Sequence, residues 1–437
     1  MKKYLYLILF VAAIGTIFLA YEKGSKFLPF YEQLSKEHVS MEKDLQMHDQ
    51  KEAHFVGSSK CVECHKENHT AWSHSRHPKM IQDPVKNPEV VVADFSKLPE
   101  DANFKLSDAV YTVGGKFKQR FMMRHDINGT EDYVLGNYQW NVQTQKWQGF
   151  KPWKYWYKSA YPHDNNKLPT SRACDGCHFT GFMSSEKRVE SGISCEACHG
   201  PASKHVADPD SKVYLASLSD PVRQNEVCLQ CHMRNRDKRL ETKTMAEIFG
   251  DAKDYPAGYE AGKALVDYKM VAPFVLGHET KEFYANGMAK KNRTQGNEFV
   301  HSMKGRHGIT CINCHNPHTL EPTAQKNRGN KLCMECHTFG SPIGPHQANI
   351  EAHTHHKADS KGSLCVECHM PKVARHTGKS PITVRTHMFG FVTPNETLKY
   401  KMPQETNACF ACHKKDRDMK TLQKDLESWG MVGWDKR

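Results

Sequence analysis

The stretch CEACHGPASKH, from Cys195 to His205, sets the pattern that decides the fold of this chain. Its two cysteines are three residues apart and a histidine follows the second, which is the spacing of a covalent attachment site for a c-type haem. On one helical turn, side chains at positions i and i+3 share a face. Both thiols can therefore reach one porphyrin, while the adjacent His199 reaches its iron.

Seven further stretches share this pattern, and the eight motifs together use all 16 cysteines of the 437-residue chain. The cysteines expected to attach haem are Cys61, Cys64, Cys174, Cys177, Cys195, Cys198, Cys228, Cys231, Cys311, Cys314, Cys333, Cys336, Cys365, Cys368, Cys409 and Cys412. The expected proximal iron ligands are His65, His178, His199, His232, His315, His337, His369 and His413. Zinc ribbons and redox dithiols do not require a histidine after every second cysteine. The sequence therefore predicts eight covalently bound haems, with no thiol left for a disulfide or a nucleophile.

The low hydrophobic content of the chain agrees with a core in which haem groups replace apolar side chains. Hydrophobic residues make up 38% of the chain and the mean hydropathy is −0.70, which is low for a protein of this length. We therefore expect a mainly α fold with extensive irregular loops wrapped around eight stacked haems, and a small antiparallel β insert between the first and second motifs.

The formal charge of +12 would ordinarily suggest an anionic partner such as nucleic acid. Sixteen propionates and eight ferric porphyrin cores change that charge to roughly +4 when oxidised and roughly −4 when reduced. No nucleic-acid partner is therefore expected.

Residues 1–21 begin with two lysines and then run uncharged from Tyr4 to Tyr21. This length is at the lower limit for a membrane-spanning helix, and Phe18-Leu19-Ala20 lacks the small residue expected at the first position of a cleavage site. We expect an uncleaved anchor on the periplasmic side of the cytoplasmic membrane; a cleaved signal that releases a periplasmic or secreted protein is the alternative. Residues 22–54 follow as a stalk or linker helix.

The remaining boundaries follow the motifs. Residues 55–235 form a haem domain with the first four motifs, 236–299 a helical or loop connection, 300–415 a haem domain with the last four, and 416–437 a C-terminal helix and tail. The insert at 87–160 contains the β-rich runs EVVVADF, AVYTV and KFKQRFMM, with turns at Gly114-Gly115 and Asn128-Gly129. Its aromatic residues, such as Trp147, are expected to pack on haem.

A repeat in motif spacing suggests a duplication. The motifs at Cys174, Cys195 and Cys228 match those at Cys311, Cys333 and Cys365 in spacing to within one residue, although local identity is low. If a three-haem unit was duplicated, equivalent motifs should make equivalent contacts.

Several segments between residues 55 and 416 resemble the multihaem c-type cytochromes related to the tetrahaem cytochrome of ammonia oxidisers. The matching segments are CVECH with W-x-x-S-x-H, GISCEACHGPASKH, GITCINCHNPH, GNKLCMECH with HTHH, CVECHMP, RTHMF and NACFACHKKD. That group includes octahaem members, some fused to tetratricopeptide repeats, which this chain lacks. Cytochrome c nitrite reductases are a more distant resemblance.

The resemblance implies a set of distal iron ligands. The candidates are His77, His205, His318, His387, one of His355 and His356, and then His301 and His307; weaker ones are His353, His346, His74 and His376. A distal histidine usually ligates a haem other than the one attached beside it, so these candidates are not paired from sequence.

The leading functional hypothesis is electron transfer in anaerobic or chemolithotrophic respiration. Iron with two histidine ligands has no open position, so it passes electrons without binding substrate. The expected partners are a quinol dehydrogenase that supplies electrons, and a terminal reductase or an outer-membrane cytochrome that receives them.

Two alternatives remain open. One haem could lack its sixth ligand and reduce nitrite, hydroxylamine, sulfite or tetrathionate; no catalytic residue is assigned, and the C-x-x-C-K motif of many nitrite reductases is absent. A polymerised extracellular cytochrome filament is the third reading, which requires cleavage of the N-terminal segment.

Overall fold

The computed structural model describes residues 53–127, 129–150, 169–182, 188–211, 219–237, 255–256, 258–271, 277–319, 329–376 and 380–431. The predicted anchor and almost all of the predicted stalk lie outside these segments. No helix within them is long and apolar enough to cross a bilayer.

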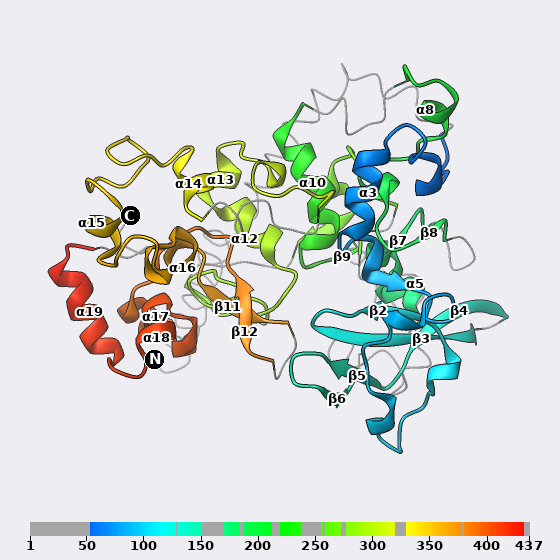
Figure 1. The fold of residues 1–437 in the computed structure, drawn as a ribbon, viewed down its shortest axis with the longest axis horizontal. Helices are drawn as coiled ribbons and strands as arrows, with labels where there is room; N and C mark the ends of the chain where they lie inside the picture. Colours follow the sequence, from blue (N-terminus) through cyan, green and yellow to red (C-terminus); the bar gives the residue numbers. More distant parts are fainter. Residues whose placement is uncertain are drawn as a thin grey trace, which may run out of the picture.

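The largest regular element is a six-stranded antiparallel sheet that lies between the first and second motifs (Figure 1). Its strands are β1 (Ile81–Gln82), β2 (Ala109–Gly114), β3 (Lys118–Ile127), β4 (Thr130–Leu135), β5 (Tyr138–Asn141) and β6 (Lys146–Gly149). They run in the order β1-β2-β3-β5-β6, with β4 paired to the far end of β3. The antiparallel insert is thus confirmed, although it begins before residue 87 and is the main sheet of a mixed fold.

Both faces of this sheet are apolar. One face carries Met122 and Tyr133, which pack against Cys174 and Phe179 of the second motif's segment. The other carries Phe121, which is covered by the chain's own residues 91–104 and by Trp147. Trp147 therefore packs inside the sheet's own core, with its ring centre 5.3 Å from that of Phe95, and the expectation that it packs on haem is wrong. The other aromatic residues at the end of the insert, at 153–157, lie outside the described segments.

The run EVVVADF does not form the strand that its β-branched residues predict. Residues 88–90 form a 3₁₀ turn, and the backbone of the next residues bonds to a side chain. The Gln119 amide accepts from the N–H groups of Val92 and Ala93 at 2.9 and 3.1 Å, and donates to the Val90 carbonyl at 2.6 Å. One buried glutamine satisfies groups that a neighbouring strand would otherwise pair.

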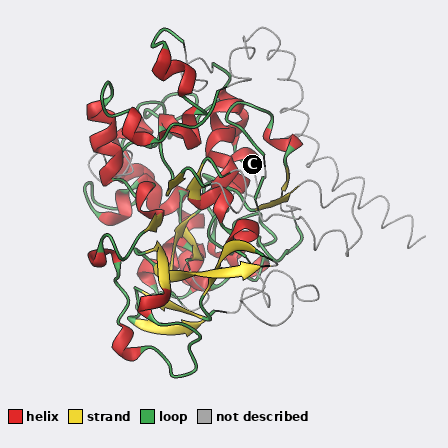
Figure 2. Cartoon of the chain, turned by 90° about the vertical axis from the view of Figure 1, so that its right-hand side faces the viewer, coloured by secondary structure: helices red, strands yellow, loops and turns green. Residues whose placement is uncertain are grey.

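The rest of the chain is short helices, small hairpins and many loops. The helices are α3 (Lys66–His74), α5 (Thr170–Ala173), α6 (Asp175–His178), α7 (Cys195–His199), α8 (Ser203–Ala207), α10 (Pro221–His232), α12 (Gln295–His301), α13 (Met303–Arg306), α14 (Lys331–Met334), α15 (Ile350–Thr354), α16 (Cys365–His369), α17 (Pro394–Lys399), α18 (Ala408–His413) and α19 (Met419–Ser428). The two-stranded hairpins are β7 (Phe179–Thr180) with β8 (Glu190–Ser191), β9 (Asn235–Asp237) with β10 (Lys269–Val271), and β11 (Lys372–Arg375) with β12 (Ile382–Arg385). Figure 2 shows the helices gathered above the main sheet.

The C-terminal helix forms where the sequence stripe predicts it. Asp418 caps α19 by accepting from the Thr421 N–H at 2.7 Å, and Met419, Leu422 and Leu426 are buried. The helix packs on α17 and α18 at the end of the molecule opposite the main sheet (Figure 1).

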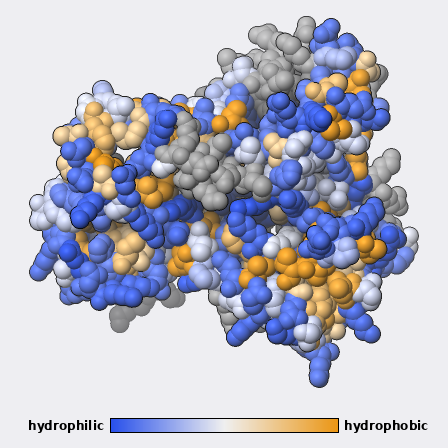
Figure 3. All heavy atoms as spheres, viewed as in Figure 1, coloured by the Kyte–Doolittle hydropathy of each residue, from blue (hydrophilic) through white to orange (hydrophobic). Residues whose placement is uncertain are grey.

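Charged and polar side chains dominate the face shown in Figure 3, with hydrophobic ones gathered over the sheet at lower right. This face is therefore mostly polar, and apolar groups that stabilise the fold have to lie in the interior.

Candidate functional site

Each C-x-x-C-H motif folds into one helical turn. Five motifs end the helices α6, α7, α10, α16 and α18. In the other three, the histidine N–H donates to the carbonyl of the first cysteine at 2.9 Å, for His65, His315 and His337 alike. The turn places both Sγ atoms and the imidazole on one side, as covalent haem attachment requires.

One connected cavity of about 3300 Å³ joins these motifs. Cysteines or histidines of the second to the eighth motif line it, together with apolar side chains. A site for one small ligand measures roughly 300 to 1000 Å³. The cavity therefore fits several large apolar groups rather than one ligand.

Six of the eight motif histidines face a second histidine from another segment of the chain. The pairs, with the distance between ring centres, are His65 and His205 at 6.1 Å, His232 and His77 at 6.4 Å, His199 and His318 at 6.2 Å, His315 and His387 at 6.3 Å, His369 and His353 at 6.2 Å, and His413 and His356 at 6.0 Å.

These distances fit an iron between each pair of rings. Two metal–nitrogen bonds of about 2 Å, each continued by about 1.1 Å to a ring centre, place two axial imidazoles about 6.2 Å apart. Direct ring stacking would bring the centres much closer, as in the 3.5 Å contact of Phe117 with His376. The residues present therefore fit haem iron held by two histidines.

Burial favours the neutral form of three of these imidazoles. Burial, followed by the charge of neighbouring histidines, lowers the pKa of His199, His232 and His387 to about 4. A metal ligand must offer a nitrogen without its proton, so these histidines are ready to bind iron at neutral pH.

Contacts between motifs arrange them in a row. Three pairs of cysteine side chains from different motifs lie side by side, Cys61 with Cys195, Cys228 with Cys311, and Cys333 with Cys365. The Gln230 amide of the fourth motif donates to the Ala197 carbonyl of the third at 3.1 Å. Cys314 lies beside the sixth motif, and Cys368 beside the eighth. The row therefore runs through motifs one, three, four, five, six, seven and eight.

The second motif joins this row at the side. Its Cys177 Sγ lies 3.8 Å from the carbonyl of Gln230, in the fourth motif. Its His178 is buried, and burial together with the charges of Arg293, Arg120 and Lys118 lowers its pKa to about 3. Among the described residues, no second histidine ring is paired with His178.

Basic side chains surround His178 instead. Arg120, on β3, donates to Gln139 at 2.9 Å and lies over the Phe150 ring at 3.8 Å. Lys118 is two residues away on the same face of the strand, and burial beside Arg120 holds its pKa well below the usual range. No carboxylate in the described segments forms an ion pair with Lys118, Arg120 or Arg293. Arg120, whose pKa stays at about 10, and Arg293 therefore offer positive charge to an anion.

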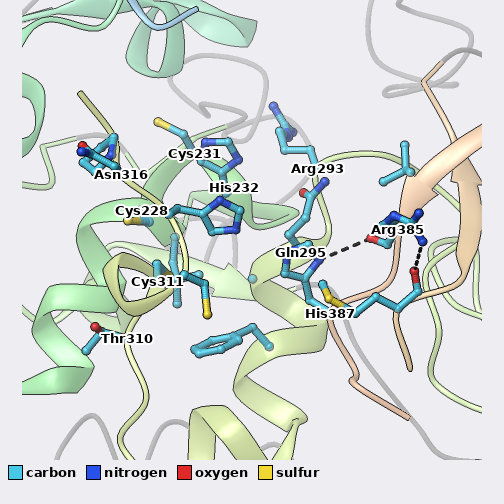
Figure 4. Close-up of a pocket in the computed structure, with 18 of the residues that line it drawn as sticks. Cys228, Cys231, His232, Arg293, Gln295, Thr310, Cys311, Asn316, Arg385 and His387 are labelled. Atoms are coloured by element: carbon cyan, nitrogen blue, oxygen red, sulfur yellow. Dashed lines mark hydrogen bonds between the residues drawn. The ribbon is translucent and has the colours of Figure 1, made fainter. Parts of the chain in front are cut away.

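Arg293 is held by its loop. Its φ of 61° lies in the left-handed region that a non-glycine residue rarely adopts. Arg234 donates to the backbone carbonyl and the side-chain oxygen of the preceding Asn292 at 2.9 and 3.0 Å. Figure 4 shows Arg293, His232 and His387, which come from separate segments, around the same part of the cavity.

Two family models match segments of the chain. The model described as "Cytochrome c554 and c-prime" matches residues 135–200, and "Doubled CXXCH motif" matches residues 304–341. Both matches contain attachment motifs, and the cavity and histidine pairs lie around those motifs. The chain is a multihaem c-type cytochrome.

Known proteins similar to this cytochrome include a sulfite reductase and a second multihaem cytochrome. Dissimilatory sulfite reductase MccA of Wolinella succinogenes is 22% identical over 72% of this chain and 50% of its own length. Multiheme cytochrome MtrA of Shewanella baltica is 27% identical over 36% of this chain and 46% of its own. The cytochrome thus spans about half the length of each relative.

A solved structure shares the fold. The outer cell wall cytochrome OcwA superposes with a TM-score of 0.64 at 23% identity, over 86% of both chains. The cytochrome therefore has a multihaem fold of mixed secondary structure with many loops.

Some predicted distal ligands lie elsewhere in the cytochrome. His355 stacks on Trp429 with ring centres 4.2 Å apart, and its φ of 55° ends α15 and turns it away from the neighbouring His356. His307 is exposed and faces no motif histidine in the described segments, and His301 is half-buried. Of the weaker candidates, His353 does face a motif histidine. His376 stacks on Phe117, as described above.

Sequence reasoning did not single out the basic pocket. Lys118 and Arg120 alternate along a strand, so their shared face could be read from the sequence. That this face meets the second motif is a tertiary fact, which no local pattern reveals.

Proposed function

We propose that this chain is an eight-haem electron relay. The observation that carries the proposal is the set of six histidine pairs spaced for iron. Iron held by two histidines accepts and releases an electron without exchanging a ligand, so little rearrangement opposes the transfer. The row of motifs supplies neighbouring carriers from the first motif to the eighth.

In the proposed setting, the relay lies on the periplasmic side of the cytoplasmic membrane, anchored by residues 1–21. Electrons enter from a quinol dehydrogenase and leave to a terminal reductase or an outer-membrane cytochrome. The similarity to MtrA and OcwA, whose names describe a multihaem cytochrome and an outer cell wall cytochrome, supports this setting.

Protein-film voltammetry of the purified holoprotein tests the relay. We expect every haem to be reduced and reoxidised reversibly through one contact with the electrode. If a large fraction of the iron, measured optically in the same film, does not exchange electrons, the row of motifs does not act as a relay.

A second candidate function is the reduction of a small oxyanion at the haem of the second motif. The observation that favours it is the pocket of Lys118, Arg120 and Arg293 around His178, which is connected to the relay through the fourth motif. The similarity to sulfite reductase MccA supports the same class of substrate. In the competing reading, haem propionates pair with these cations and the relay has no substrate.

Optical and electron paramagnetic resonance spectra separate the two readings. A substrate site predicts one high-spin haem that changes on addition of sulfite, nitrite or hydroxylamine. Spectra with only low-spin haem, unchanged by all three, would leave the relay alone.

A further inference from the structure

The sixth motif differs from its neighbours in what faces its histidine. The Nε2 atom of His337 lies 2.8 Å from the Nζ atom of Lys304, where six other motif histidines face an imidazole. We propose that Lys304 is the distal ligand of the iron attached at Cys333 and Cys336. This inference rests on the proposed function, because it requires a haem at this motif.

The orientation of His337 agrees with iron binding. Its Nδ1 group donates to the backbone carbonyl of Ile343. That bond fixes the orientation of the ring and leaves the lone pair on Nε2, which is the usual arrangement of a metal-binding histidine. Lys304 therefore lies on the side where the iron of this motif belongs.

The position of Lys304 is fixed by its own short helix, α13. The Ser302 hydroxyl caps this helix by accepting from the Gly305 N–H at 3.2 Å. Gly305 lies against the preceding helix, where an added Cβ would come within 2.3 Å of the Phe299 carbonyl oxygen. The backbone that carries Lys304 is thus closely packed, although its side chain is long enough to adjust.

The surroundings of Lys304 suit a ligand better than a surface ion pair. Its Nζ lies 5.3 Å from the centre of the Phe389 ring, and no described carboxylate forms a salt bridge with it. Two histidines of the following helix segment, His353 and His356, face the seventh and eighth motifs instead.

Ligation requires a modest change at Lys304. The amine must first release its proton to solvent, so that a nitrogen lone pair can bind the iron. Two metal–nitrogen bonds of about 2 Å separate the axial nitrogens by about 4 Å, so Nζ has to retreat by roughly 1 Å. The flexible four-carbon stem of lysine allows that movement.

Near-infrared magnetic circular dichroism and electron paramagnetic resonance of the holoprotein test this ligand. We expect one haem per chain with the low-spin signature of an amine and an imidazole. In Lys304→Ala this species should be lost, one high-spin haem should appear, and carbon monoxide should bind one additional haem per chain. Lys304→His should convert the same haem to a bis-imidazole species, and Lys331→Ala, which removes an exposed lysine of the same motif's helix, should change nothing.

Each other outcome has a definite meaning. A wild-type protein without an amine-ligated haem, or a Lys304→Ala protein with unchanged spectra, would overturn the proposal. If Lys304→Ala yields no holoprotein, the wild-type spectrum decides alone. Mass spectrometry of the peptide that contains Cys333 distinguishes failure of the Lys304 proposal from failure of the proposed function. A peptide without haem would refute the eight-haem relay at this motif.

Discussion

Replacement of His318 by alanine tests the pairing of histidines from different segments of the chain. His318 follows the fifth motif but faces His199 of the third motif, with ring centres 6.2 Å apart and planes 8° from parallel. Its removal should therefore affect the haem attached at Cys195 and Cys198, rather than the one attached beside it. No other described histidine is paired with His199.

The size of the effect follows from one ligand in eight haems. In the oxidised His318→Ala protein, about one-eighth of the iron should change from low-spin to high-spin, because that iron loses its second strong ligand. The reduced protein should bind one more carbon monoxide per chain than the wild type. Added imidazole should restore the low-spin state, since it can occupy the space left by the side chain.

The assay is quantitative electron paramagnetic resonance with optical titration of carbon monoxide. His307→Ala is the matched control, because this histidine was also a candidate ligand but is exposed and faces no motif histidine in the described segments. If His318→Ala keeps its full low-spin signal, or if His307→Ala loses as much, the pairing is wrong.

Three further perturbations test other parts of the molecule. If the second motif has a substrate site, Arg120→Gln should weaken the binding of sulfite or nitrite by about 10-fold or more, because one charge-assisted hydrogen bond is lost. Lys116→Gln is the control and should leave the binding unchanged. Equal spectral titrations of the two variants would count against the site. Burial raises the pKa of Glu298 to about 7, against about 4.3 in an unfolded chain, so its contribution to stability is largest at low pH and is lost as the pH rises through 7. The loss amounts to up to about 4 kcal/mol. Glu298→Gln should therefore flatten this part of the curve of thermal midpoint against pH, and parallel curves for the two proteins would disprove the assignment. Leu422→Ala should lower the free energy of unfolding by about 2 to 5 kcal/mol, because its side chain lies on the buried face of α19. The exposed Lys424→Ala is its control, and similar thermal midpoints in both variants would refute the packing.

The local chemistry of the attachment sites was readable from the sequence because it depends on only five consecutive residues. Two cysteines and a histidine on one helical turn define a site without help from the rest of the chain. The sheet was predicted for a similar reason, since its strands and tight turns are local patterns. The failure at residues 89–95 has a tertiary cause, because the competing partner is the side chain of Gln119 on a distant strand.

The distal side of each haem depends on long-range packing, so the sequence could nominate ligands without pairing them. In HTHH, His353 and His356 each face a motif histidine, whereas the left-handed backbone at His355 directs that residue to Trp429. Lys304 had no signal in the sequence, because it lies outside every C-x-x-C motif and no local pattern marks it as a distal ligand.

The proposed duplication of a three-haem unit can be tested only against tertiary contacts. The equal spacings predict that Cys195 and Cys333 occupy equivalent positions. In the structure Cys195 contacts Cys61, whereas Cys333 contacts Cys365. The thiol contacts therefore do not repeat between the two triplets.

The most direct test of the relay is an inventory of spin states in the wild-type holoprotein. Integrated electron paramagnetic resonance of the oxidised protein and carbon monoxide titration of the reduced protein count the haems with two strong ligands. The six histidine pairs predict at least six low-spin haems per chain that do not bind carbon monoxide. Ligation by Lys304 would add a seventh low-spin haem, and the haem beside His178 would be the one that binds carbon monoxide. Fewer than six such haems would contradict the relay.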